Sequence, residues 1–145
     1  MKKILFLLAL LLVLPRIALA LDGTVTTTTD WIPGQLVKIV KITWTSTSAG
    51  EAWQNIGEVN GKVFAVRTSP SAVIGLVPTD NYDVYIKEFG TAYSYLTTTL
   101  ENRDTANTEW VAPANVPLYG TVGFSVSASG DITSGDCWLY VEVPK

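Results

Sequence analysis

The stretch PTDNYDVYIKEFGTAYSY, residues 78–95, decides the fold of this chain. Its opening Pro, Asp and Asn residues are turn formers, and the residues after them alternate along the chain. One set is Tyr82, Val84 and Ile86, and the other is Asp83, Tyr85 and Lys87. Because successive side chains of a strand point to opposite faces, this pattern predicts a half-buried strand. A turn at Gly90, which supplies a positive φ, then leads into a second aromatic run, so the stretch predicts a hairpin.

The same alternation recurs before and after this hairpin. Residues 36–47 give the clearest further strand, with Val40, Ile42 and Trp44 on one face and a high β-branched content. Residues 62–68, 118–129 and 137–143 predict three more strands. In the last of these, Cys137, Leu139 and Val141 share the face that we expect to be buried.

Turn signals separate the predicted strands. Residues 46–61 predict a long irregular loop, with room for a short strand at 57–59, and Asn60-Gly61 predicts a hairpin turn at its end. Residues 100–109 predict a loop with Asx-type turns. Six to eight short strands without an amphipathic helix predict an all-β domain over residues 36–145, a single antiparallel β-sandwich of jelly-roll or immunoglobulin-like order.

The first twenty residues predict a cleavable signal peptide. Lys2 and Lys3 form a positive start, residues 4–14 are apolar, and Ala18-Leu19-Ala20 fits the small residues that a signal peptidase reads. A retained anchor helix is the alternative, but the apolar run is shorter than the about 20 residues that a membrane span needs. We therefore expect an exported protein with no stable membrane insertion after cleavage, located in the periplasm, at the cell surface or outside the cell.

Charge and composition restrict the function of the mature chain. Removal of 20 of the 145 residues leaves 125, and seven basic residues then face thirteen acidic ones, a net charge of −6. A negative surface argues against nucleic acid as a partner. The chain has one cysteine, Cys137, and no histidine, so an internal disulfide and Ser-His or Cys-His catalysis are excluded. We expect no cofactor.

Four carboxylates in or beside turns are candidates for a catalytic or metal site: Asp80, Asp83, Asp104 and Glu109. Glycoside hydrolysis needs two carboxylates at a fixed separation, and calcium needs several converging oxygens. The sequence indicates neither, and Asp or Asn at such places ordinarily caps a turn. We therefore predict no catalytic and no metal residues.

Aromatic residues give the strongest functional signal in the composition, with five Trp and six Tyr. Trp138 and Tyr140 lie opposite the face that Leu139 must bury, so they face outward. Such a pair can anchor a protein interface, stack on sugars, or lie under a covering loop such as residues 46–61. A sugar-binding role would use Trp53, Trp110 or Trp138.

The Thr-rich residues 21–35 predict an N-terminal arm or an edge strand. An unpaired edge or arm can add a strand to a neighbouring sheet, which makes Val25 and Thr27 candidate interface residues. With Trp138, Tyr140 and Trp53, they form the predicted interface.

Several segments together resemble a group of small structural proteins of tailed bacteriophages and prophages. The matching segments are ITWTS at 42–46, NGKVFAVRTSP at 60–70, PTDNYDVYI at 78–86 and NRDTANTE at 102–109, followed by the two closing strands. The resemblance covers residues 40–143. It implies a β-rich, non-enzymatic virion component that works through protein contacts.

We therefore expect an exported structural or interaction protein, phage-related, that forms a homo-oligomer or joins a larger assembly through strand edges and exposed aromatic residues. Virion association would follow if the resemblance holds. The alternative is a secreted carbohydrate-binding module, which makes a glycan the second candidate partner. A carboxylate-dependent hydrolase is the weakest hypothesis.

Overall fold

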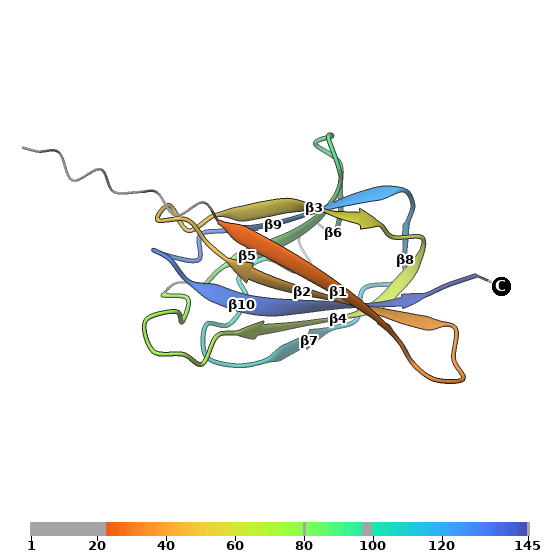
Figure 1. The fold of residues 1–145 in the computed structure, drawn as a ribbon, viewed down its shortest axis with the longest axis horizontal. Coiled ribbons are helices and arrows are strands. Elements are labelled where there is room, and N and C mark those ends of the chain that lie inside the picture. The colour runs from red at the N-terminus through yellow and green to blue at the C-terminus, as the bar shows by residue number, and fades with distance from the viewer. Residues whose placement is uncertain (1–22, 80, 97–99, 145) are drawn as a thin grey trace, which may run out of the picture.

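The computed structural model describes residues 23–79, 81–96 and 100–144, and these residues form ten β-strands. The larger antiparallel sheet contains, in spatial order, β1 (Thr24–Trp31), β2 (Val37–Thr45), β10 (Ser134–Glu142), β4 (Gly61–Pro70) and β7 (Glu109–Val111), with β8 (Val116–Leu118) also paired to β4. The smaller contains β3 (Ala52–Glu58), β9 (Thr121–Ser127), β5 (Asp83–Glu88) and β6 (Ser94–Leu96). The two sheets lie one above the other (Figure 1). The predicted all-β class is confirmed.

The strand pairs are nested around the hairpin of residues 78–95. β5 pairs with β6, β4 with β7 and β8, β3 with β9, and β2 with β10. In sequence, the two strands of each pair lie on either side of the previous pair, so all the pairs are nested around the β5–β6 turn. The predicted hairpin is therefore confirmed, and Gly90 has the expected positive φ of 82°.

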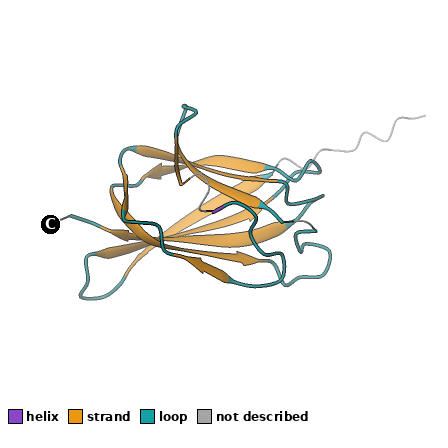
Figure 2. Ribbon diagram, turned by 180° about the vertical axis from the view of Figure 1, so that it is seen from behind, coloured by secondary structure: helices purple, strands orange, loops and turns teal. Residues whose placement is uncertain are grey.

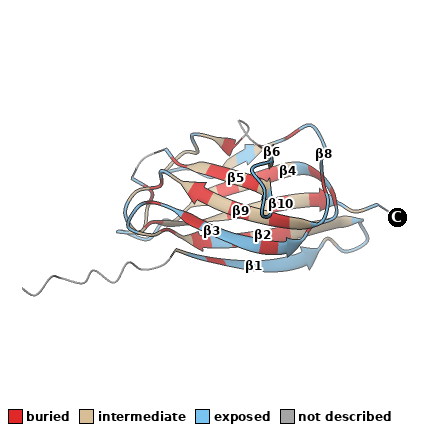
Figure 3. Ribbon diagram, turned by 90° about the horizontal axis from the view of Figure 1, so that it is seen from above, coloured by how far each residue is buried: buried red, intermediate tan, exposed pale blue. Residues whose placement is uncertain are grey.

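One face of each sheet forms a shared hydrophobic core. The faces predicted for β2, β5 and β10 are confirmed, because Ile42, Ile86 and Leu139 are all fully buried. Further buried side chains come from both sheets: Val40, Trp44, Tyr82, Val84, Val122, Phe124, Val126, Cys137 and Val141. Buried and less buried residues alternate along the inner strands (Figure 3). Burial of apolar surface at roughly 25 cal/mol per Å² is the main stabilising contribution to such a core.

The prediction for residues 46–61 is wrong in two respects. Residues 52–58 form the full strand β3, which pairs with β9 in the smaller sheet. Asn60-Gly61 does not close a hairpin, because the following strand, β4, belongs to the larger sheet. A side chain at position 61 would collide with the backbone oxygen of Glu142, and φ is +146° there, so the crossing between sheets requires glycine.

Residues 118–129 were predicted as one strand and instead contribute to two. β8 ends at Leu118 in the larger sheet, and β9 begins at Thr121 in the smaller one. Gly120, with φ +75°, lies at the change of direction. Tyr119, beside it, is exposed. Apolar alternation continues through the break, which is why the sequence did not reveal it.

Strands and connecting loops make up nearly all of the drawn chain (Figure 2). Within the residues that the structure describes, no helix is long and apolar enough to cross a membrane. The predicted signal peptide, residues 1–20, lies outside the described residues, as does Asp80. Residues 24–31 form an edge strand, which is one of the two alternatives predicted for residues 21–35.

Candidate interaction surfaces

A row of alternating cations and indole rings crosses the outer face of the larger sheet. Strand register places Lys41 on β2 opposite Trp138 on β10, Trp138 opposite Arg67 on β4, and Arg67 opposite Trp110 on β7. We call these four residues the cation–aromatic row. It arises because residues directly opposite one another in adjacent strands have side chains on the same face.

Trp138 is the centre of this row. The guanidinium carbon of Arg67 lies 4.3 Å from the Trp138 ring centroid, and the Lys41 Nζ lies 5.4 Å from it. Both distances are within the range of cation–π attraction. The predicted outward direction of Trp138 is therefore confirmed, but cations from both neighbouring strands occupy its surroundings. Trp138 is less suited to stack on a sugar than the sequence suggested.

The two cations of the row differ in their ionic partners. Lys41 forms an ion pair with Asp136 at 3.3 Å, whereas Arg67 forms none with any residue in 23–79, 81–96 or 100–144. The Arg67 Nε is buried and has no hydrogen-bond partner, and its guanidinium carbon lies 5.8 Å from the Trp110 ring centroid. Arg67 is thus a half-buried cation held mainly by aromatic rings.

Tyr140 extends the aromatic surface beside the row. Its ring centroid lies 5.2 Å from that of Trp110 and 6.3 Å from that of Phe64, with both pairs tilted. Such tilted pairs add about 0.5–1.5 kcal/mol beyond their buried area. The covering loop considered for Tyr140 and Trp138 does not lie here, since residues 52–58 belong to the other sheet.

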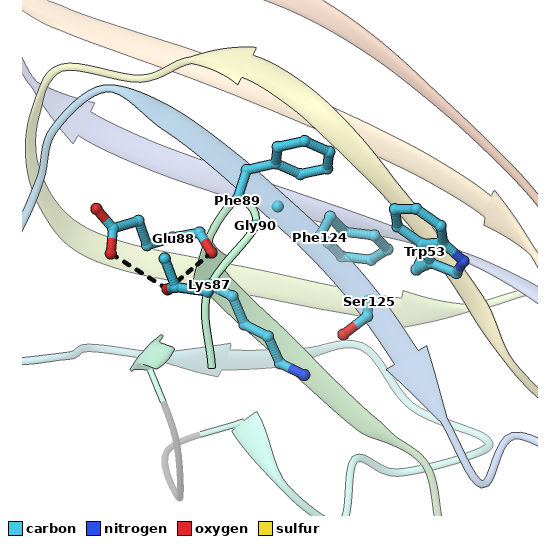
Figure 4. A pocket seen from close by; sticks show the side chains of 9 residues that line it. Trp53, Lys87, Glu88, Phe89, Gly90, Phe124 and Ser125 are labelled. Atoms are coloured by element: carbon cyan, nitrogen blue, oxygen red, sulfur yellow. Dashed lines mark hydrogen bonds between the residues drawn. The ribbon is translucent and has the colours of Figure 1, made fainter. Parts of the chain in front are cut away.

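The smaller sheet has a groove on its outer face. It has a volume of about 330 Å³, and Trp53 of β3 and Phe89 of the β5–β6 turn line it together with Lys87, Gly123 and Ser125. The rings of Trp53 and Phe89 are nearly parallel, with 6.4 Å between centroids and 23° between planes. Figure 4 shows both rings beside β9, whose Ser125 lies below Trp53 in this view, while Phe124 is buried in the core. Trp53 is 70% exposed, so its predicted accessibility is confirmed.

The groove has few polar contacts of its own. The Thr91 hydroxyl donates to the Glu88 carboxylate at 3.2 Å, which fixes the turn beside Phe89. Lys87 lies over the Tyr85 ring, with Nζ 4.6 Å from the centroid. The floor of the groove is formed in part by Gly123, which has no side chain, and by Ser125, which has a small one.

β1 is the most exposed strand of the sandwich-like body. Of its eight residues only Val25 is buried, and Figure 3 shows the rest of the strand in pale blue. Val25 packs into the core opposite Trp44, so only its backbone, and not its side chain, is available to a partner. Thr27 is exposed, as predicted. Alternation along β1 directs the Val25 side chain toward the other sheet. β1 contacts β3 of that sheet, and Val25 is the only residue of β1 that is buried.

Three of the four carboxylates named as candidates for a catalytic or metal site, Asp83, Asp104 and Glu109, have structural partners. The Asp104 carboxylate accepts hydrogen bonds from the backbone of Ala106 and Asn107 and from the Asn107 side chain, and these bonds lower its pKa. This is the predicted Asx-type turn. Asp83 accepts a hydrogen bond from the Asn102 amide, and Glu109 lies 3.5 Å from Arg103. Among the described residues, no cluster of three or more potential metal ligands exists.

Cys137 and Tyr82 are ionisable groups in the core. Burial is the main cause that raises the pKa of the Cys137 thiol, and the Asp136 charge adds to it. Burial likewise raises the pKa of the Tyr82 hydroxyl, whose ring lies 5.4 Å from that of Trp44. A thiol held neutral is a poor nucleophile, so Cys137 acts in the core as a small hydrophobic residue on the face that was expected to be buried.

Sequence reasoning missed three residues of these surfaces: Lys41, Arg67 and Phe89. Alternation in their strands does place Lys41 and Arg67 on outward faces. Their meeting with Trp138 depends on the pairing of β10 with both β2 and β4, which no local pattern contains. Phe89 was identified only as part of a turn.

Fold and surfaces define an all-β protein of two packed antiparallel sheets with aromatic residues on both outer faces. No family model, no curated protein and no solved structure matches the chain.

Proposed function

We propose that this protein is an exported, non-enzymatic structural protein that associates with further copies of itself through the free edge of β1. The observation that carries the proposal is the pairing of β1. Its eight residues pair with β2, and no other strand of the described chain lies on its opposite side. A strand edge of this length presents a row of unpaired backbone N–H and C=O groups to a partner.

The composition of β1 supports this proposal. Proteins that remain monomeric usually protect a free edge with Lys, Pro or a bulge, whereas β1 contains five Thr residues and a single charged residue, Asp30. Its last residue, Trp31, is 55% exposed. Exposed aromatic residues are enriched where protein surfaces meet.

The nested strand pairs support a jelly roll as the finer description of the fold. In an immunoglobulin-like sandwich the strands divide differently between the sheets, with the order ABED in one and CFG in the other. Here successive strands from β2 to β5 alternate between sheets and return in reverse order to β10. We propose export through the N-terminal segment and a relationship to tailed-phage structural proteins as parts of the same hypothesis.

Light scattering of residues 21–145 over a range of concentrations tests self-association. We expect a mass above that of the monomer that rises with concentration. Thr27→Lys places a charge on the free edge, which should weaken association at least tenfold. Ser48→Lys, which adds the same charge on the exposed loop after β2, is the matched control and should leave the mass unchanged. A monomer at every concentration would refute the proposal.

The groove between Trp53 and Phe89 favours a second candidate function, the binding of a neutral glycan. Two nearly parallel exposed rings over a shallow floor suit the apolar faces of sugar rings. Titration with neutral oligosaccharides should then shift tryptophan fluorescence, and Trp53→Ala should abolish the shift. An unchanged response in Trp53→Ala would exclude this groove.

A further inference from the structure

Arg67 is the one member of the cation–aromatic row whose charge has no carboxylate partner in the described chain. Lys41 is already neutralised by Asp136. The outer face of the larger sheet therefore carries an uncompensated positive charge on a protein whose predicted mature net charge is −6. The positive charge of Arg67 attracts an anion to this point, while the negative charge of the rest of the protein repels it.

The geometry of Arg67 selects the kind of anion. The guanidinium lies against the Trp138 ring, and its Nε is buried. The two terminal nitrogens are consequently the ones open to a ligand. A planar guanidinium binds a carboxylate with two parallel N–H···O bonds, a geometry that lysine does not offer.

An exposed aromatic platform lies directly beside this cation. Trp110 is 61% exposed and is the neighbour of Arg67 on the edge strand β7. Tyr140 of β10 reaches across β4 to the Trp110 ring, with 5.2 Å between ring centroids, and holds it in place. An exposed indole held in this way can stack on the apolar face of a sugar ring.

A peptide suits this face less well than a saccharide. Peptides gain much of their affinity by pairing with unpaired backbone groups at a sheet edge. β10 and β4 are each paired on both sides, so Trp138 and Arg67 offer side chains only. The edge strand β7, which carries Trp110, is only three residues long and offers few backbone groups for pairing. One carboxylate-binding cation beside one ring platform can bind a single uronic acid within a saccharide, a contact that does not require the basic patch that a nucleic acid needs.

We propose that Arg67 and Trp110 form a binding site for an acidic polysaccharide. Arg67 receives the carboxylate of a uronic acid, and Trp110 stacks on the ring of that sugar or the next one. This site is separate from the β1 edge and from the Trp53–Phe89 groove, so it does not depend on self-association.

Titration calorimetry with polygalacturonate and hyaluronate tests the site, using the protein as purified after expression of the full chain. We expect binding that weakens as salt rises and that methyl esterification of polygalacturonate reduces at least tenfold, because the esters remove the carboxylates. Arg67→Lys keeps the charge and loses the paired hydrogen bonds, and Trp110→Ala removes the platform. Each should weaken binding at least tenfold, whereas the control Tyr119→Ala, which removes an exposed ring in the turn between β8 and β9, should not change it.

Three results would overturn the proposal. The first is an absence of binding to both polymers. The second is equal affinity in either of two comparisons. These are the acidic against the fully esterified polymer, and the wild type against Arg67→Lys. The third is equally tight binding of poly-glutamate, which would show that any chain of carboxylates suffices. Circular dichroism of each variant establishes that a loss of binding is not a loss of fold.

Discussion

The guanidinium carbon of Arg67 lies 4.3 Å from the ring centroid of Trp138 on the neighbouring strand. Seventy-one residues of sequence separate the two, and the pairing of β4 with β10 alone brings them together. The contact thus depends on the last strand lying between β2 and β4. It also places the free charge of Arg67 beside the exposed ring of Trp110.

We predict that Arg67→Gln lowers the free energy of unfolding by about 1 kcal/mol, the typical size of a cation–π contact that is partly exposed. Urea denaturation measures the change. Lys62→Gln, an exposed position on the same strand without a ring contact, is the control and should alter stability by less than about 0.5 kcal/mol. A more stable Arg67→Gln variant would mean that the buried, unpaired Nε costs more than the ring contact contributes.

Glycines 61 and 90 should respond very differently to substitution by alanine. Both have positive φ, but a Cβ at position 90 meets nothing within 4 Å, whereas one at position 61 strikes the Glu142 backbone and the Val141 side chain. We expect Gly90→Ala to cost about 1 kcal/mol from backbone conformation alone. Gly61→Ala should cost about 3 kcal/mol or more, because overpacking adds to it. Equal midpoints in thermal unfolding would contradict this difference.

The sequence contains the strands and their faces but only part of their pairing. Local alternation at Val84 and Ile86 predicts a buried face, and Gly90 predicts a turn, so the central hairpin was predictable. Gly61 has the pattern of a hairpin turn and Gly120 that of a residue inside a strand, yet each lies where the chain passes from one sheet to the other. A turn signal gives a change of direction, and only packing over the shared core determines which sheet receives the next strand.

The surfaces were predictable to a similar extent. The outward direction of Trp138 was predictable because period-two alternation fixes the face of a residue. Trp53 was placed in a loop, so its position on the outer face of β3 was not predicted. The burial of the Val25 side chain was not predictable, because burial of an edge-strand residue depends on how far the opposite sheet extends. Lys41 and Arg67 became relevant only through strand register.

Stability should fall in mildly alkaline solution because of Cys137. Burial raises its pKa in the folded state, while the unfolded thiol keeps its ordinary value of 9.0. The folded state therefore holds the proton as the unfolded state loses it, so the stabilising contribution is present below about pH 9 and is lost as pH rises above it. The slope attributable to this group is at most about 1.4 kcal/mol per pH unit.

Guanidinium denaturation of the wild type and Cys137→Ala between pH 7 and 10 measures this effect. The variant should be less stable at pH 7, because it loses buried volume, but its stability should fall less between pH 9 and 10. Parallel pH profiles would show that the thiol does not contribute. Tyr82, whose pKa is also raised by burial, should add a further decline above its ordinary value of 10.0 in both proteins.

Ser46 joins two loops at one end of the fold, and its removal should be costly for its size. It is buried, and its hydroxyl accepts a hydrogen bond from the Thr133 amide at 2.9 Å and donates to the Gly130 oxygen at 3.3 Å. Ser46→Ala leaves the Thr133 amide buried without this partner, so we expect a loss of about 1–3 kcal/mol in the free energy of unfolding.

Ser48→Ala is the matched control for this variant, since Ser48 is exposed in the same loop. It should change stability by less than about 0.5 kcal/mol in urea denaturation. Hydrogen exchange adds a local readout: the Thr133 amide should exchange faster in Ser46→Ala, because it loses its acceptor, while amides in the β5–β6 hairpin should change only with global stability. Unchanged protection of Thr133 would mean that another acceptor replaces the hydroxyl and that Ser46 does not hold the two loops together.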